Sequence, residues 1–373
     1  MNIKSITKSW IVTIASTIFA YDLAFAGGTL LSLPVSPRVI YRQAGNASPP
    51  ELFHTADGRM RIVMADRSDH MLIFMLAQNV WTMVTTETSA TGSGHALPSG
   101  NSWMYATLTG YPRRLALYSA RGGSFDSFNI TTGEDEPVTP TLANGSSKVF
   151  VAYRDARRQE LKGAFPYADR WEQVLIDKNG NAGEGCRAIS LSSREIGIAY
   201  LATVLDRREL RYAQGDASHW RLTRVDLDVC DSVSLMVSLA VAPDGTIGIA
   251  YYKAGQIMYA FSRQSSWKTI AIPDAYGIYP DLAFDSASRP YIAFYADLSS
   301  SEGKSHGLAL SVLENGRWIS RVLDSRQGYG CGITPSIAFD ASGNACIAYQ
   351  DSDQDQKLLK LISVPASTIA GAN

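Results

Sequence analysis

Short apolar segments recur along the chain, and polar turns separate them at regular intervals. In the hairpin at residues 238–251, two apolar segments flank the turn residues Asp244 and Gly245, and residues 336–349 repeat this arrangement. The apolar segments do not alternate with polar residues, as the tripeptide Ile-Ala-Tyr at 198–200 shows. A half-solvated strand would alternate, so both faces of these strands are predicted to be covered.

Tryptophan marks the period of this pattern. Trp171, Trp220, Trp267 and Trp318 are separated by 49, 47 and 51 residues, and Trp81 lies 90 residues before Trp171. A third kind of strand precedes the Trp strand in each repeat, with copies at 70–76, 114–120, 160–165, 209–213, 256–262, 307–313 and 357–363. Four antiparallel strands in each period of about 45–51 residues predict the blades of a β-propeller.

The copies predict an all-β protein with seven blades. The last copy ends near residue 363 without a Trp strand, but residues 38–41 (Arg-Val-Ile-Tyr) resemble residues 321–324 (Arg-Val-Leu-Asp). We therefore expect the N-terminal strand to complete the last blade, which would cover an otherwise open sheet edge. The second blade, at about 98–136, is the most degenerate copy. A count of six blades is the alternative.

The repeat loosely resembles the propellers of sialidases and of fungal or bacterial lectins. The resemblance covers nearly the whole chain, at the level of repeat shape, and it implies a carbohydrate-related role. The sialidase Asp-box, Ser-x-Asp-x-Gly-x-x-Trp, is absent, because Asp244-Gly245 has no Trp three or four residues further on. This departure argues against sialidase activity.

The N-terminus predicts export. Lys4 and Lys8 precede an apolar run at 11–21 that is too short to span a bilayer, and Ala24-Phe25-Ala26 fits a cleavage site. We expect residues 1–26 to be a signal peptide, residues 27–373 to be one propeller domain, and the protein to be secreted or periplasmic with no membrane span. The net charge of −1 excludes a basic field for nucleic acid.

Four cysteines in an exported chain permit disulfides. Cys186 and Cys230 occupy comparable places in consecutive connections between blades, and we predict a disulfide between them. No Cys or His spacing typical of zinc is present, and the chain has no phosphate-binding loop. We therefore expect neither a metal nor another cofactor.

Two sets of loops are expected on one face of the propeller: those between second and third strands, and those between successive blades. The first set is charged, and three of its Asp residues fall directly after a second strand, where a ring of carboxylates and guanidinium groups would hydrogen-bond sugar hydroxyls. Short solvated loops are also rich in Asp and Arg without any ligand. The candidate ligand-binding residues in this set are Asp66, Arg154, Asp155, Arg157, Asp297 and Asp351.

The second set of loops is rich in Gly and Tyr. Tyr276, Tyr279 and Tyr329 would offer aromatic faces to sugar rings, although packing over the strand ends is the alternative. The favoured function is a non-catalytic propeller that binds carbohydrate or an extracellular or periplasmic protein through this face. The alternatives are a carbohydrate-active enzyme, either a glycoside hydrolase or a polysaccharide lyase, and a structural scaffold in an envelope assembly. Whether the chain is an enzyme stays open at this point.

Overall fold

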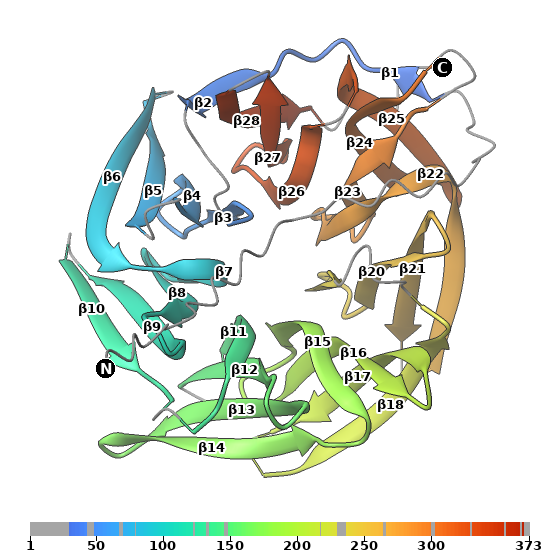
Figure 1. Ribbon diagram of the computed structural model, residues 1–373. Coiled ribbons are helices and arrows are strands. Elements are labelled where there is room, and N and C mark those ends of the chain that lie inside the picture. The colour runs from blue at the N-terminus through green and yellow to red at the C-terminus, as the bar shows by residue number, and fades with distance from the viewer. Residues whose placement is uncertain are drawn as a thin grey trace, which may run out of the picture.

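The chain forms a ring of seven four-stranded blades around a central axis (Figure 1). The computed structural model describes residues 30–42, 48–66, 70–78, 80–121, 124–131, 134–144, 148–216, 218–229, 236–263, 266–299, 303–328, 330–353, 356–365 and 368. The blades follow one another in chain order, and the first strand of each lies closest to the axis. The predicted all-β propeller with seven blades is confirmed.

Each of the first four blades is a four-stranded antiparallel sheet. Blade 1 contains β3 (Glu51–His54), β4 (Met60–Ala65), β5 (His70–Ala77) and β6 (Val80–Ser89). Blade 2 contains β7 (Thr91–Ser99), β8 (Ser102–Thr109), β9 (Arg114–Arg121) and β10 (Ser124–Asn129). Blade 3 contains β11 (Pro137–Asn144), β12 (Val149–Asp155), β13 (Glu160–Tyr167) and β14 (Arg170–Asp177). Blade 4 contains β15 (Asn181–Ser190), β16 (Ile196–Val204), β17 (Arg207–Gly215) and β18 (Trp220–Leu227).

Blades 5 and 6 share one long strand, β22 (Ser266–Phe284). Its first half pairs with β21 as the outer strand of blade 5, and its second half pairs with β23 as the inner strand of blade 6. The other strands of blade 5 are β19 (Ser238–Val241), β20 (Ile247–Lys253) and β21 (Gln256–Arg263). Blade 6 continues with β23 (Pro290–Asp297), β24 (Ser305–Glu314) and β25 (Arg317–Gln327).

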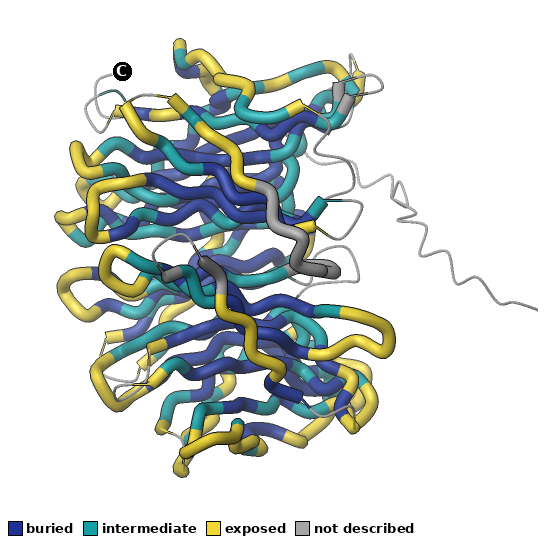
Figure 2. Tube along the Cα trace, turned by 90° about the vertical axis from the view of Figure 1, so that its left-hand side faces the viewer, coloured by how far each residue is buried: buried dark blue, intermediate teal, exposed yellow. Residues whose placement is uncertain are grey.

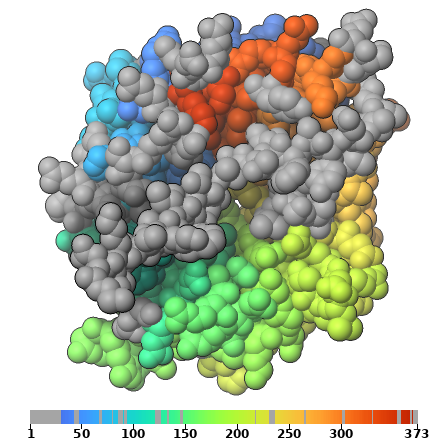
Figure 3. Space-filling model, in the orientation of Figure 1, coloured from blue at the N-terminus to red at the C-terminus, as the bar shows by residue number. Residues whose placement is uncertain are grey.

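The N-terminal segment closes the ring, as predicted. Blade 7 contains β26 (Cys331–Phe339), β27 (Ala345–Asp353) and β28 (Gln356–Val364), and β2 (Arg38–Arg42) pairs antiparallel with β28 as its fourth strand. The short strand β1 (Leu31–Ser32) runs parallel to β25 on the outer edge of blade 6. The N-terminal segment therefore spans two blades, and the start and end of the described chain lie side by side (Figure 3).

Apolar side chains fill the space between every two neighbouring blades. Seven core clusters are present, and each draws its residues from two adjacent blades. The buried parts of the chain are the strand centres, whereas the turns at both ends of the blades are exposed (Figure 2). This arrangement explains why the inner strands are apolar on both faces: each face packs against a different blade.

Blade 2 begins earlier than predicted, at Thr91 instead of about residue 98. Its first strand, with the sequence TGSGHALPS, is rich in Gly and Ser and lacks the apolar run that marks the other copies. No helix in the described part of the chain is long and apolar enough to cross a membrane. The predicted signal peptide, residues 1–26, lies outside the described residues.

Candidate functional site

The inner strands of all seven blades place one residue each at the same level of the propeller. In each strand this residue pairs with the central position of the second strand, which is Ala in six blades and Val63 in blade 1. The seven residues, which we call the axial ring, are Glu51, His95, Thr141, Arg187, Ser238, Asp281 and Ser336. All seven are polar, and each directly precedes the apolar part of its strand in the sequence.

A β-bulge positions several members of the axial ring. The ladder shifts register directly before the ring residue in β7, β11, β15, β22 and β26. Thr139, Tyr279 and Thr334 have positive φ angles of 48°, 56° and 45°, and each precedes a proline. Proline has no N–H to give to a ladder, so a bulge is where a strand tolerates it, and the bulge turns the next side chain toward the axis.

Six ring residues accept a hydrogen bond from the backbone of the next blade. The donor is always the amide that follows that blade's own ring residue. For example, Leu142 donates to His95 Nδ1 at 2.8 Å, and Ile337 donates to Asp281 Oδ2 at 2.9 Å. The remaining acceptors are Glu51, Thr141, Ser238 and Ser336. The ring is thus first a structural belt that joins the blades.

Arg187 breaks this pattern because a guanidinium cannot accept a hydrogen bond. Its Nη1 instead donates to Glu51 Oε1 at 3.0 Å, which joins blade 4 to blade 1. Burial opposes its charge, but the neighbouring Glu51 and Asp281 carboxylates raise the pKa of Arg187. Burial, helped by the charge of Asp281, raises the pKa of Glu51 against the opposing effect of Arg187. Three charged groups therefore gather on the axis.

These groups line an axial pocket to which every blade contributes. Its wall contains Glu51, Arg187, Ser238, Asp281 and Ser336, and its volume is about 90 Å³. Asp281 also accepts from Ser238 Oγ at 2.7 Å, so both of its oxygens hold protein donors. A convergent set of polar groups with shifted pKa values in a concave site is the usual signature of a functional pocket.

The predicted ring of exposed carboxylates is not formed by Asp155 and Asp351, which are buried. A lysine from the third strand of the same blade neutralises each: Lys162 Nζ lies 2.9 Å from Asp155, and Lys360 Nζ lies 2.5 Å from Asp351. Burial opposes ionisation of Asp155, but its hydrogen bond from Lys162 and others lower its pKa. Asp155 is held by partners in its own blade, and Asp351 also pairs with Arg326 of blade 6, so both carboxylates are engaged by the protein.

The other charged candidates are partly exposed and already have partners. Asp66 is half-buried and accepts from the His70 amide at 2.8 Å, and Asp297 accepts from the Ser299 amide at 3.0 Å. Arg154 donates to Asn181 Oδ1 at 2.7 Å, and the Arg157 guanidinium donates to the carbonyl of Glu134 at 3.3 Å. They are spread over blades 1, 3 and 6 and do not come together as one site.

The structure describes two of the three candidate tyrosines. Tyr276 and Tyr279 are half-buried on β22, and burial raises the pKa of Tyr279. Tyr279 stands two residues before Asp281 in the chain, but it is not among the residues that line the axial pocket. Tyr329 lies outside the described residues.

The predicted disulfide is not formed at Cys186, whose thiol is free. The side chain turns into the core between blades 3 and 4, where its Sγ donates to the carbonyl of Thr139 at 3.0 Å. Burial raises the pKa of this thiol to about 11, which keeps it protonated and unreactive. Cys230 lies outside the described residues.

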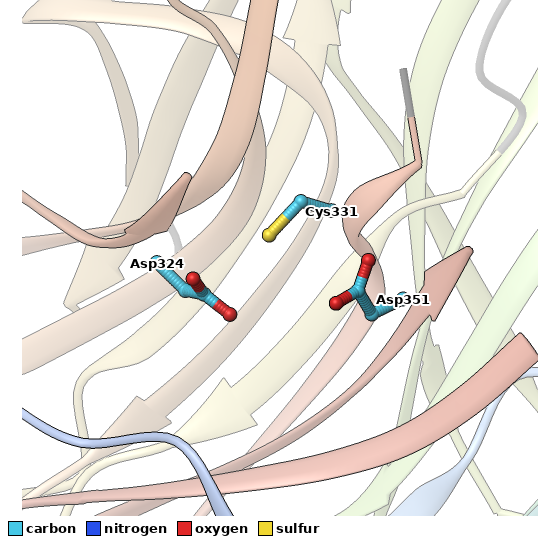
Figure 4. Close-up of side chains that lie close together, drawn as sticks. All are labelled: Asp324, Cys331 and Asp351. Carbon is cyan, nitrogen blue, oxygen red and sulfur yellow. The ribbon is translucent and has the colours of Figure 1, made fainter. Parts of the chain in front are cut away.

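Asp324, Cys331 and Asp351 gather closely enough to suggest a metal site, with ligand atoms within 4.8 Å of one another (Figure 4). The ammonium of Lys360 already bridges the two carboxylates, at 3.1 Å from Asp324 and 2.5 Å from Asp351. Burial, with the two carboxylate charges, raises the pKa of the Cys331 thiol to about 12. A protonated thiol and a resident cation do not fit a metal centre.

Glu51, Arg187 and Asp281 were not among the site residues predicted from the sequence. A signal was present, because a tripeptide ending in a polar residue precedes the apolar hairpin at 139–141, 279–281 and 334–336, each time with a central proline. Aligning the repeats on this tripeptide would have shown which copies carry a charge.

No protein-family model matches the chain, and no curated protein sequence matches it. Solved structures do. An α-L-arabinofuranosidase from Fusarium graminearum, in complex with an iminosugar inhibitor, matches with a TM-score of 0.53 at 10% identity, over 92% of this chain and 100% of that one. A protein of unknown function from Dyadobacter fermentans matches with a TM-score of 0.54 at 12% identity, over 89% and 98%.

A lectin from Aleuria aurantia, in complex with α-methyl-L-fucoside, matches with a TM-score of 0.50 at 12% identity, over 77% of this chain and 97% of that one. The chain shares its fold with lectin and glycosidase propellers. At these identities the likeness concerns the fold alone, so the function has to be argued from the residues of this chain.

Proposed function

We propose that the chain is an exported, non-catalytic propeller that binds a neutral glycan at its axial pocket. Export rests on the predicted signal peptide at 1–26, with residues 27–373 forming the mature propeller. The glycan assignment is supported by the character of the pocket, where carboxylate, hydroxyl and guanidinium groups converge. Such groups hydrogen-bond sugar hydroxyls in two directions, as donors and as acceptors.

One observation carries the choice of binding over catalysis: the axial carboxylates are already committed to protein donors. Glu51 accepts from Arg187, and Asp281 accepts from Ser238 and Ile337. A pocket of about 90 Å³ is also smaller than the 300–1,000 Å³ that usually enclose a ligand. A pocket of this size can take the exocyclic groups at one end of a glycan. It is too small to enclose the two sugar rings on either side of a scissile bond.

The choice of a neutral glycan follows from the charges on the axis. A carboxylated sugar requires an unpaired cation, and Arg187 is paired with Glu51 and close to Asp281. The known sugar complexes of the same fold, with a fucoside and with an iminosugar, are consistent with a carbohydrate ligand.

A glycosidase is the second candidate, favoured by the raised pKa of Glu51. A carboxyl group with a raised pKa serves as a general acid when a second carboxylate stands nearby, and Asp281 is in the same pocket. In this case, Glu51 would protonate the leaving oxygen, and Asp281 would act as the base or nucleophile.

A glycan array probed with residues 27–373, combined with product analysis of every bound glycan, separates the two candidates. We expect saturable binding to neutral glycans and no new reducing ends. New reducing ends that disappear in the Glu51→Gln variant would establish the glycosidase. An array without hits would overturn the carbohydrate assignment altogether.

A further inference from the structure

A groove at the edge of blade 4 has the chemistry of a second binding site. It lies between the turn that joins β15 to β16 and the turn that joins β17 to β18, at the opposite end of the blade from the loops between blades. Its volume is about 580 Å³, within the range of pockets that hold a small ligand. Its wall includes Arg194, Glu195, Gln214, Gly215, His219 and Trp220.

The groove exists in blade 4 because a glycine replaces a larger residue of the repeat. Gly215 pairs with Trp220 across the ladder, and the residues that pair with the equivalent tryptophans of blades 3, 5 and 6 are Pro166, Ser262 and Leu313. A Cβ at Gly215 would come within 2.0 Å of the carbonyl oxygen of His219. The turn of blade 4 is therefore folded in a way that only glycine permits.

In blades 3, 5 and 6, a hydrogen-bonded side chain crosses the corresponding place between the first turn and the third strand. In blade 3, Lys148 Nζ donates to the Pro166 carbonyl at 2.9 Å and lies over the ring of Tyr167. In blade 5, Arg263 donates to Thr246, and in blade 6, Arg289 donates to Glu314 at 2.9 Å.

Blade 4 has a hydrogen bond of the same kind, but it lies in the wall of the groove. Glu195, directly before β16, accepts from Gln214 Nε2 of β17 at 2.9 Å, and both residues line the groove. Asp216 accepts from the amides of Ser218 and His219, both at 2.8 Å, within its own turn. With these side chains in its wall, the groove beside Trp220 keeps a volume of about 580 Å³.

The groups around the groove match a sugar that carries a carboxylate. The half-buried indole of Trp220 is backed by the ring of Phe150, with ring centroids 5.6 Å apart, so it is held rigidly. Within the described part of the chain, the exposed guanidinium of Arg194 has no ion-pair partner, whereas Glu195 accepts a hydrogen bond from Gln214. An aromatic face packs against a sugar ring, and a guanidinium grips a carboxylate with two hydrogen bonds.

We propose that this groove binds a carboxylated sugar unit, which packs against Trp220 and pairs with Arg194. The site is independent of the axial pocket, on a different part of blade 4 and with the opposite preference for ligand charge. Binding at both places would let one molecule engage two parts of a polysaccharide and gain avidity.

Calorimetric titration with trigalacturonate and its neutral counterpart galactotriose tests the proposal on the mature protein. We expect trigalacturonate to bind with an affinity at least about tenfold above that of galactotriose, and Arg194→Gln to remove this difference. Trp220→Phe should weaken binding further, whereas the matched control Trp171→Phe in blade 3 should leave it unchanged. Binding should persist in Asp281→Asn, which distinguishes this site from the axial pocket.

Arg194 is on an exposed turn, so we expect Arg194→Gln to fold even if Trp220→Phe does not. Circular dichroism checks the folding of each variant. Absence of saturable trigalacturonate binding overturns the proposal. Equal affinity for both trisaccharides, or full affinity in Arg194→Gln, overturns the role of the carboxylate.

Discussion

The same pair of side chains joins the blades at four interfaces. A tyrosine hydroxyl within a second strand donates to an aspartate from the preceding blade or from the connection that follows it, at 2.5 to 2.8 Å. The pairs are Tyr153 with Asp135, Tyr200 with Asp177, Tyr251 with Asp226, and Tyr349 with Asp324. Between blades 5 and 6, Phe294 and Pro273 stand at the equivalent positions, so both partners change together. These pairs are interactions between blades, and their polar atoms are not available to a ligand.

Tyr200→Phe should lower the free energy of unfolding by about 1–2 kcal/mol, because it removes a buried hydrogen bond to Asp177. Denaturant unfolding of the purified protein measures this loss. Tyr212→Phe is the matched control: its hydroxyl is buried and has no partner among the described residues, so its removal should cost nothing. Equal losses in the two variants would show that the bond contributes no stability.

The sequence did not predict in which direction the side chains of the candidate site point. Asp155 and Asp351 were correctly located after a second strand, but their burial depends on Lys162 and Lys360, which reach them from another strand. Arg187 and Glu51 are 136 positions apart, and only closure of the ring brings them within 3.0 Å. Contacts of this kind belong to the assembled propeller and leave no local pattern.

At the scale of elements, the repeat was predictable because every strand obeys the same local rule. The third strands begin and end close to the predicted bounds in all seven blades, and the tryptophans at 81, 171, 220, 267 and 318 lie in outer strands. Blade 2 was placed several residues late, since a Gly- and Ser-rich strand carries no hydrophobic signal. The strand β1 was not predicted, because two residues are too few for a periodicity to be visible.

The N-terminal strands carry the closure of the ring. Removal of residues 30–42 would uncover the edge of β28 and take Leu33 out of the core between blades 6 and 7. We expect this truncated chain to melt at a lower temperature and to aggregate, as measured by circular dichroism and light scattering. A synthetic peptide of residues 30–42 should restore the melting temperature. A truncated chain as stable as the intact one would mean that β2 does not hold the ring closed.

At the scale of the whole molecule, seven similar blades surround an axis at which the polar residue differs from blade to blade. Six residues of the axial ring accept the same backbone hydrogen bond from the next blade. Arg187 cannot accept this bond, and it places a cation on the axis, where it pairs with Glu51. A repeat fold thus produces a unique pocket by varying one position per blade.

Calorimetric titration of a neutral glycan from the array, with the intact protein and with Asp281→Asn, tests the account most directly. The variant keeps an acceptor for the Ile337 amide but loses the charge on the axis, and Asp340→Asn, in an exposed turn of blade 7, is the matched control. We predict that Asp281→Asn weakens binding by about tenfold or more, as expected when a charged hydrogen-bond partner is lost, and that Asp340→Asn has no effect. Unchanged affinity in Asp281→Asn would contradict glycan binding at the axis.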